Sequence, residues 1–305
     1  MRVLAIGECM AELSPKAQPG DFHLGFAGDT FNTAWYLAML SPDIDVSYFT
    51  AVGDEALSER MLRAMSEAGI GTRHIRKVKG RALGLYMISL DKGERSFSYW
   101  REQSAARLLA EDTEALNAAI AESDLVYVSG ITLAILDGPG RNTLLEAMRS
   151  ARRAGKRVAF DPNLRLHLWD GAGQMTEVIM QAAACCNIAL PSFEDEARWF
   201  ADKDAEATLD RYVGAGADTV IVKNGAASVH YRQNGRNGAV PVQALASVVD
   251  TTAAGDSFNA AVLAGLATDM PLGEAIEQGC RLAGQVVQSR GALVPIRLNL
   301  LEQFA

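Results

Sequence analysis

The chain has 305 residues, of which 49% are hydrophobic and 22% are charged, and its formal net charge at pH 7 is −8. This length suffices for a sizeable buried core, and no apolar run is long enough to cross a bilayer. The acidic balance disfavours general nucleic-acid binding, so local Arg and Lys side chains would have to attract any anionic ligand. The four cysteines, Cys9, Cys185, Cys186 and Cys280, lack a metal-binding spacing, and we expect reduced thiols in a cytoplasmic protein.

Short strand-like runs alternate with helix-like stretches along most of the chain. The first run follows one positive charge and soon meets Glu8, which is typical of a buried strand rather than a signal peptide. Strands are predicted at residues 3–8, 47–53, 125–130, 157–161, 188–191 and 219–223. Helices are predicted at residues 30–40, 55–68, 111–121, 141–154, 174–184, 205–214, 256–267 and 272–289. The alternation predicts an α/β fold with a doubly wound, mostly parallel sheet flanked by helices.

Two regions, 13–26 and 83–100, break this rhythm because they are extended without intervening helices. In the second, the segments 84–90 and 95–100 flank a turn that contains Gly93, which is a hairpin pattern. Composition alone predicts an antiparallel excursion here, whose strands can form a small separate sheet over the main domain.

The most informative stretch is residues 250–261, Asp-Thr-Thr-Ala-Ala-Gly-Asp followed by Ser-Phe-Asn-Ala-Ala. Small residues let backbone N–H groups converge at a helix N-terminus, where the helix dipole favours an anion. Asp256 would stand beside that anion, where a carboxylate can take the proton of an attacking hydroxyl. The alternative is that Asp256 only caps the helix. The whole string favours the catalytic interpretation.

Motifs of several other enzyme classes are missing from the sequence. There is no P-loop, no complete dinucleotide-binding fingerprint, no H-E-x-x-H and no G-x-S-x-G. Their absence disfavours a Walker-type ATPase, a Rossmann dehydrogenase, a zincin and a serine hydrolase. Without a Walker lysine, we expect the turn at Ala254 and Gly255 to hold the phosphate.

Two further segments carry candidate ligand-binding side chains. Asn163 and Arg165 follow a predicted strand, at the edge where open α/β sheets bind ligands, although a Pro-containing turn is the structural alternative. Arg101 follows an aromatic strand, and Arg pairs well with a carboxylate, although most such residues are ordinary surface arginines.

The stretch 250–261 resembles the signature of the PfkB (ribokinase-like) family of carbohydrate kinases, and the resemblance covers essentially the whole chain. It implies a single ribokinase-like domain over residues 1–305, with a small β-sheet lid from about 9–27 and 83–103. It implies ATP and Mg²⁺ as cofactors, and some members also bind a monovalent cation such as K⁺. It further implies a cytoplasmic homo-oligomer that pairs through the lid and binds neither nucleic acid nor membrane.

The resemblance assigns roles to residues that match the family's motifs. It places the anion hole at Ala253, Ala254 and Gly255, and it makes Asp256 the general base. The family's sugar-binding motif is matched by Gly28, Asp29 and Asn32, with Ala27 in place of its first glycine. Without the resemblance, these three residues would be read as the capped start of a helix.

Within the family, the segments 8–10, 84–86, 93–102, 129–134 and 161–169 resemble the branch that phosphorylates 2-keto-3-deoxygluconate. This branch implies that Tyr86 and Tyr99 contact the carbon chain and that Arg101 and Arg165 bind the carboxylate. The alternatives are a family kinase for fructose, ribose or a related keto-deoxy sugar acid, a nucleoside kinase, and a non-catalytic sugar sensor.

The nucleotide-binding residues follow from the same resemblance. They are Asn163, Arg165, Ser192, Lys223, Gly225, Thr252 and Gly255. Where the family carries an N-x-x-E motif for magnesium, this chain has Ser192 and Asp195, so Asp195 is the predicted Mg²⁺ ligand. Asp250 is the predicted ligand of a monovalent cation. The histidines receive no catalytic role, and His167 is the one closest to a predicted site loop.

Overall fold

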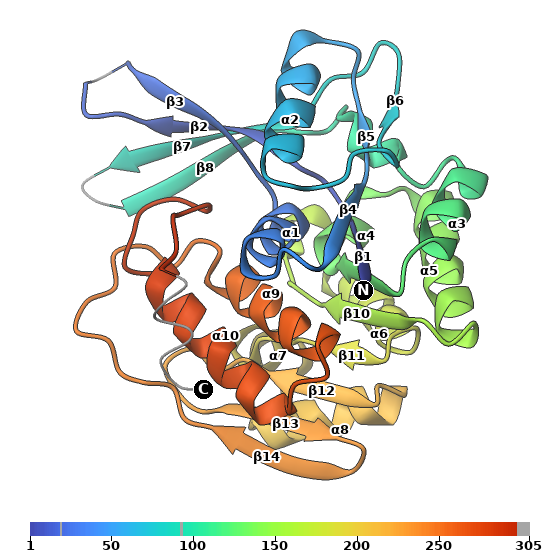
Figure 1. Ribbon diagram of the computed structural model, residues 1–305, viewed down its shortest axis with the longest axis vertical. Helices are drawn as coiled ribbons and strands as arrows, with labels where there is room; N and C mark the ends of the chain where they lie inside the picture. Colours follow the sequence, from blue (N-terminus) through green and yellow to red (C-terminus); the bar gives the residue numbers. More distant parts are fainter. Residues whose placement is uncertain (19, 92–93, 298–305) are drawn as a thin grey trace.

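The computed structural model describes residues 1–18, 20–91 and 94–297 (Figure 1), so the predicted turn at Gly93 lies outside the described residues. Within these ranges, eight strands form the main sheet in the order β14-β13-β12-β11-β10-β9-β1-β4. In that order, their bounds are Arg236–Val240, Val229–Gln233, Thr219–Val222, Ile188–Ala189, Arg157–Asp161, Leu125–Ser129, Arg2–Ile6 and Asp45–Phe49.

Neighbouring strands from β12 to β4 run parallel, which confirms the predicted mostly parallel sheet. Strands β13 and β14 pair antiparallel at one edge, and our sequence-based prediction omitted both. The turn between them consists of Asn234 and Gly235, both with positive φ (50° and 76°). This is the backbone of a tight hairpin turn, and Asn-Gly is its usual sequence.

Helices cover both faces of the sheet, as predicted (Figure 1). On one face lie α1 (Asp29–Leu40), α9 (Ala254–Ala267) and α10 (Leu272–Val286). On the other lie α3 (Thr113–Ala121), α4 (Gly130–Ile135), α5 (Gly138–Arg153), α6 (Ala172–Ala183), α7 (Phe193–Phe200) and α8 (Ala205–Ala215). Strand β1 contributes to the hydrophobic cores on both faces of the sheet, because successive side chains of a strand point to opposite faces. Val3 lies in the core beneath α1, α9 and α10, and Leu4 lies in the core on the other face. Helices α4 and α7 are short and were not predicted.

A second, four-stranded sheet projects from the main body in the order β3-β2-β7-β8 (Figure 1). Its strands are β2 (Met10–Pro15), β3 (Phe22–Ala27), β7 (Leu85–Asp91) and β8 (Glu94–Trp100). This sheet confirms the predicted small separate sheet. Between β4 and β7 in the sequence lie β5 (Ala51–Val52), α2 (Ala56–Glu67) and β6 (Arg76–Lys77), and β5 pairs with β6 in parallel as a two-stranded sheet. The 3₁₀ turn Ala105–Leu108 follows β8, and the 3₁₀ turn Leu166–Leu168 follows β10.

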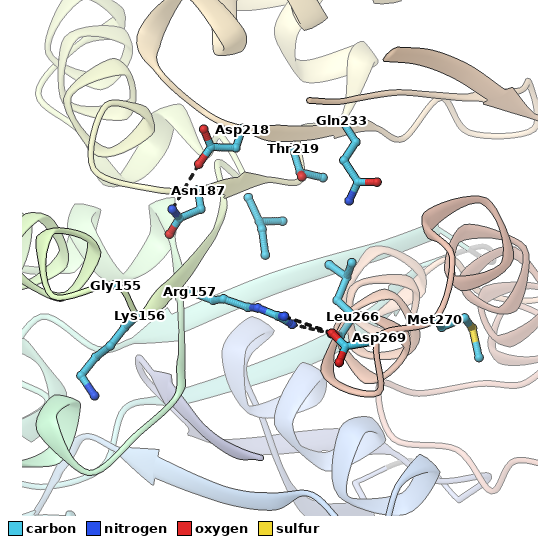
Figure 2. A pocket seen from close by; sticks show the side chains of 11 residues that line it. Gly155, Lys156, Arg157, Asn187, Asp218, Thr219, Gln233, Leu266, Asp269 and Met270 are labelled. Atoms are coloured by element: carbon cyan, nitrogen blue, oxygen red, sulfur yellow. Dashed lines mark hydrogen bonds and ion pairs between the residues drawn. The ribbon is translucent and has the colours of Figure 1, made fainter. Parts of the chain in front are cut away.

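A cavity of about 400 Å³ opens at the N-terminal ends of β10, β11 and β12, beside the C-terminal end of α9 (Figure 2). Two of its charged side chains pair with each other, because Arg157 donates to Asp269 (3.2 Å) and also to the Leu266 carbonyl. Parallel α/β sheets bind their ligands at the opposite, C-terminal strand edge. The cavity therefore lies away from the predicted site.

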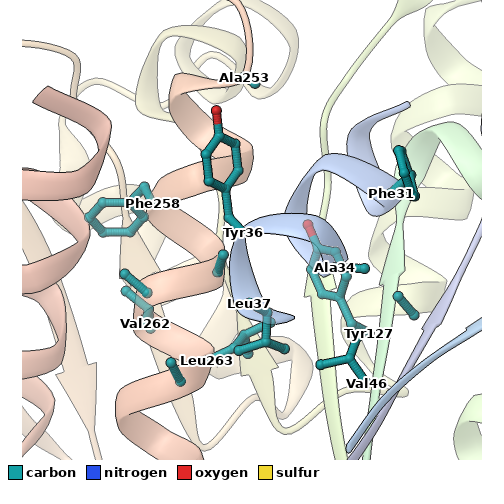
Figure 3. Packing of buried hydrophobic residues seen from close by; sticks show 14 of the residues in the cluster. Phe31, Ala34, Tyr36, Leu37, Val46, Tyr127, Ala253, Phe258, Val262 and Leu263 are labelled. Atoms are coloured by element: carbon teal, nitrogen blue, oxygen red, sulfur yellow. The ribbon is translucent and has the colours of Figure 1, made fainter. Parts of the chain in front are cut away.

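Helix α1 packs side by side with α9 on one face of the sheet (Figure 3). Tyr36 and Leu37 of α1 and Val262 and Leu263 of α9 are at most 1% exposed. Burying a side chain of this size stabilises a fold by about 1.5–3 kcal/mol. This apolar contact holds the two helices together, with their N-terminal turns side by side at the C-terminal edge of the sheet.

Candidate active site

The N-terminal turns of α1 and α9 meet the loop after β10 at the C-terminal strand edge. Asn32 Nδ2 donates to Asp256 Oδ2 (2.8 Å), which joins α1 to α9. Asn163 Nδ2 donates to Asp29 Oδ2 (2.8 Å), which joins the loop to α1. Asp256 therefore has one oxygen held by a side-chain amide, whereas both oxygens of Asp29 are held, because the Thr30 backbone amide donates to Oδ1 (2.8 Å). Asn163 lies with the predicted sugar-binding residues, although we predicted it to bind the nucleotide.

The turn that opens α9 is strained and presents free amides. Ala253, its N-cap, has a left-handed backbone (φ 59°), which is costly for a residue other than glycine. The amide of Ala254 donates to the Thr251 carbonyl (3.2 Å), so it is not the free donor that we predicted. Among the described residues, the amides of Gly255 and Asp256 have no acceptor. These two amides and the helix dipole make this turn a candidate anion-binding turn.

Lys223 places a positive charge beside this turn. Its Nζ donates to Asp161 Oδ2 (3.0 Å) and to Asn259 Oδ1 (3.2 Å). A Cβ built on Gly255 would lie 3.7 Å from Lys223 Nζ, so the ammonium group stands directly against the anion-binding turn. The side chain comes from the end of β12, far from α9 in the sequence.

A buried network of polar side chains holds the Lys223 ammonium group in place. Asn259 Nδ2 donates to Asp161 Oδ2 (2.6 Å) and to the Tyr127 hydroxyl (3.1 Å). Asn259 is fully buried and Asp161 is 4% exposed, so neither is solvated by bulk water. Our sequence analysis missed Asn259. It lies three residues after Asp256 in the same helix, and this spacing places both on neighbouring parts of one helix face.

Aromatic side chains and two arginines form the other side of the site. The Tyr99 ring stacks against His167, with 6.0 Å between ring centroids, and lies 5.9 Å from the Tyr86 ring. Burial, Arg101 and Arg165 together lower the pKa of His167, so both guanidinium groups act on this ring. The site thus combines aromatic walls with two cations. His167 was given no role from the sequence, although it lies two residues after Arg165.

Two of the predicted substrate-binding side chains have acidic partners that were not predicted. Arg101 forms a buried ion pair with Glu8, and the Tyr86 hydroxyl donates to Glu12. Within the described ranges, Glu8 Oε1 and Arg101 Nε are buried without a hydrogen-bond partner. Arg101 therefore enters the site already neutralised by Glu8, with its buried Nε donor unused.

Comparison with known proteins decides the family of this chain. The model of the pfkB family carbohydrate kinases matches residues 1–298. The chain belongs to the pfkB family of carbohydrate kinases. This membership confirms the predicted family and its enzyme class.

The relatives of this pfkB-family kinase include two enzymes named 2-dehydro-3-deoxygluconokinase. The Haemophilus influenzae enzyme is 38% identical over 300 residues, which is 96% of this chain and 95% of the relative. The Escherichia coli K12 enzyme is 38% identical over 303 residues, covering 96% of this chain and 97% of the relative. Among solved structures, the PfkB protein from Polaromonas sp. JS666 superposes with a TM-score of 0.87 at 25% identity, covering 98% of both chains. This superposition confirms the ribokinase-like fold.

In this pfkB-family kinase, the Asp256 carboxyl group lies partly buried beside two other carboxylates. Burial and the nearby charge of Asp29 raise the pKa of Asp256 to about 8, and Asp161 adds to the rise. The hydrogen bond from Asn32 and the charge of Lys223 oppose it. A raised pKa makes the carboxylate a stronger base, and a pKa within about one unit of physiological pH still leaves an ionised fraction that can accept a proton.

The predicted magnesium ligand of the kinase lies at the start of α7. Ser192, the N-cap, pairs with Lys223 in a short parallel bridge, and Asp195 follows in the first turn. Asp195 Oδ2 lies 3.2 Å from Arg165 Nη1. Across the described ranges, no three acidic, His or Cys side chains gather as a metal site. Mg²⁺ in kinases uses one or two carboxylates together with phosphates and waters, so a single carboxylate at this place fits.

The remaining predicted nucleotide-side residues of the kinase lie around the loop before α9. Thr252 Oγ1 donates to Asp250 Oδ1 (2.7 Å), and the Gly291 amide donates to Asp250 Oδ2 (2.7 Å). Asp250 thereby ties this loop to residue 291, and its cation-binding role stays a prediction. Gly225 follows Lys223 in a turn with φ 56°. Close packing requires glycine at position 28, because a Cβ there would lie 2.1 Å from the Glu8 carbonyl oxygen.

No helix in the described part of the kinase combines the length and the apolar character needed to span a membrane.

Proposed function

We propose that this chain is a 2-dehydro-3-deoxygluconokinase, which transfers the γ-phosphoryl group of ATP to the 6-hydroxyl of 2-keto-3-deoxy-D-gluconate. The observation that carries the proposal is the pair of guanidinium groups, Arg101 and Arg165, beside the Tyr99 and His167 rings. A substrate carboxylate needs fixed cations in an acidic protein, whereas fructose or ribose does not. Relatives that are 38% identical over nearly their whole length carry the same name.

In the proposed mechanism, Asp256 is the general base. The Asn32 amide holds Oδ2, which leaves Oδ1 to take the proton of the attacking hydroxyl. The hydroxyl oxygen bonds to the γ-phosphorus while the bond to the bridging oxygen of the leaving ADP breaks. The Gly255 and Asp256 amides and the Lys223 ammonium stabilise the charge on the transferring group. Mg²⁺, when bound with the nucleotide, neutralises phosphate charge, and Asp195 would help to hold it.

A substrate panel tests the proposed function. ATP consumption is measured with 2-keto-3-deoxy-gluconate, its galactonate-derived epimer, fructose and ribose at equal concentrations. We expect the specificity constant for a keto-deoxy sugar acid to exceed that for either neutral sugar by at least about 100-fold, because a charge-assisted hydrogen bond is worth about 1.5–3 kcal/mol and two arginines are available. Comparable rates with fructose would favour the neutral-sugar kinase instead.

We further propose that residues 1–305 act as one cytoplasmic domain, that the small sheet is a lid over the sugar, and that a K⁺ ion can bind near Asp250.

The lid would also join two subunits. Edge strand β8 supports this, since it exposes Phe97 and Trp100 (43% and 55%). Light scattering should give a dimer or larger species that Trp100→Ser weakens. The matched variant Val248→Ser, equally exposed (58%) but outside the lid, should leave the mass unchanged. A monomeric wild type would contradict the lid interface.

A further inference from the structure

The ion pair between Arg165 and Asp195 lies between the two proposed substrate sites. Arg165 Nη1 and Asp195 Oδ2 are 3.2 Å apart, and their side chains are 44% and 26% exposed. Arg165 belongs to the loop after β10, and Asp195 to the first turn of α7. Ion pairs this exposed are worth only about 0–1 kcal/mol, so exchange of the partner costs little free energy.

Arg165 is presented to the sugar side of the site. Its charge acts on the Tyr99 hydroxyl and on His167, two rings that stack against each other. Its hydrogen bonds to Asp195 and to the Leu164 carbonyl (2.8 Å) both use Nη1. Among the described residues, Nη2 and Nε have no partner, so one edge of the guanidinium group can still receive a carboxylate with two parallel hydrogen bonds.

Asp195 is presented to the nucleotide side. The amide of Phe193, two residues earlier, donates to the Lys223 carbonyl (2.8 Å), which fixes the first turn of α7 beside the phosphate-side lysine. Asp161, whose carboxylate holds Lys223, repels the Asp195 carboxylate and contributes to raising its pKa, after the larger effect of burial. Asp195 is therefore close to the charges of the phosphate site, and Arg165 is its only ion-pair partner within the described ranges.

We propose that Arg165 is shared between the two sites, so that the carboxylate of a sugar acid, bound at the free edge, competes with Asp195 for the single positive charge of the guanidinium group. This inference rests on the proposed function. When the substrate carboxylate binds the unoccupied Nη2–Nε edge of Arg165, it neutralises the charge that holds Asp195 on Nη1, and Asp195 becomes available to Mg²⁺ on the nucleotide. Sugar acid and Mg-nucleotide then bind with positive coupling, and by linkage each raises the affinity for the other by the same factor.

Calorimetric titration without nucleotide tests the competition directly. Asp195→Asn should bind 2-keto-3-deoxygluconate about 2–5-fold more tightly than the wild type, because removal of an exposed partner worth up to about 1 kcal/mol frees Arg165. Glu194→Gln is the matched control. It removes a carboxylate from the same helical turn that forms no ion pair among the described residues, and it should leave the affinity unchanged. Equal or weaker binding by Asp195→Asn would overturn the proposal.

The coupling has a separate readout. Saturation with the sugar acid should tighten binding of Mg²⁺ with a non-hydrolysable ATP analogue several-fold in the wild type and in Glu194→Gln. The ratio of the dissociation constants of the Mg²⁺–nucleotide without and with the sugar acid should fall to about one in Asp195→Asn. A ratio of one in the wild type overturns the coupling. Failure of the wild type to bind any keto-deoxy sugar acid would instead overturn the proposed function and, with it, this inference.

Discussion

Replacement of Asp256 by Asn is expected to lower turnover by about 10²–10⁴-fold, the range that a general base contributes. The amide keeps the size and the contact with Asn32 but cannot take the proton of the attacking hydroxyl. Nucleotide affinity should change little, because Lys223 and the Gly255 amide remain in place. The measurements are kcat with the sugar acid and the dissociation constant of a non-hydrolysable ATP analogue. Turnover within tenfold of the wild type would contradict the assignment of the base.

The stability of the same variant provides a control that the fold is intact. Because the pKa of Asp256 is raised to about 8 in the folded state from the ordinary value of 3.8, the folded protein keeps a proton that the unfolded chain has lost between these values. The free energy of unfolding therefore falls as pH rises through this window, by at most about 1.4 kcal/mol per pH unit. Asp256→Asn should remove that part of the pH dependence, whereas the exposed Asp21→Asn should not.

At about pH 8, urea denaturation should accordingly find Asp256→Asn as stable as the wild type or more so. The expected outcome is an inactive enzyme with undiminished stability. A variant that is both inactive and strongly destabilised would point to a structural role, such as the helix cap that the sequence also allowed.

Replacement of Arg101 by Met is expected to damage both the fold and the recognition of a sugar acid. The buried Glu8 carboxylate would lose its partner, and breaking a buried pair in this way costs about 3–5 kcal/mol. The Michaelis constant for the sugar acid should rise about 10–100-fold, as expected when a charge-assisted hydrogen bond is lost. Denaturation and steady-state kinetics measure the two effects.

A double variant separates these effects. Glu8→Leu combined with Arg101→Met removes both charges, and replacing a buried ion pair by apolar side chains is often neutral for stability. The double variant should therefore recover most of the lost stability while keeping the high Michaelis constant. If it recovers the wild-type Michaelis constant as well, Arg101 only neutralises Glu8 and does not bind substrate.

Much of the fold followed from local patterns. The apolar runs that became β1, β9, β10 and β12 were predicted because a parallel strand is buried on both faces. The hairpin of β13 and the edge strand β14 was missed, although its Asn234-Gly235 turn is a strong hairpin signal.

Most residues of the candidate site were predicted from the sequence, but the contacts between them were not. Asp256 and Asn32 were both chosen, but their hydrogen bond joins residues 224 positions apart. Glu8 meets Arg101 across 93 positions, and Asp195 meets Arg165 across 30. No local pattern encodes such pairs, because they depend on how β8, β10 and α7 are brought to the same edge of the sheet.

By itself, the sequence determined that small residues precede Asp256 at a helix start, and this pattern identified the family and predicted the anion-binding turn. Backbone conformation and helix capping depend on neighbouring residues, so a short string suffices to specify them. Only the tertiary structure decided which charges neutralise each other. The pKa of Asp256 and the availability of Arg101 and Arg165 depend on burial and on distances between segments, and the packing of the whole chain sets both.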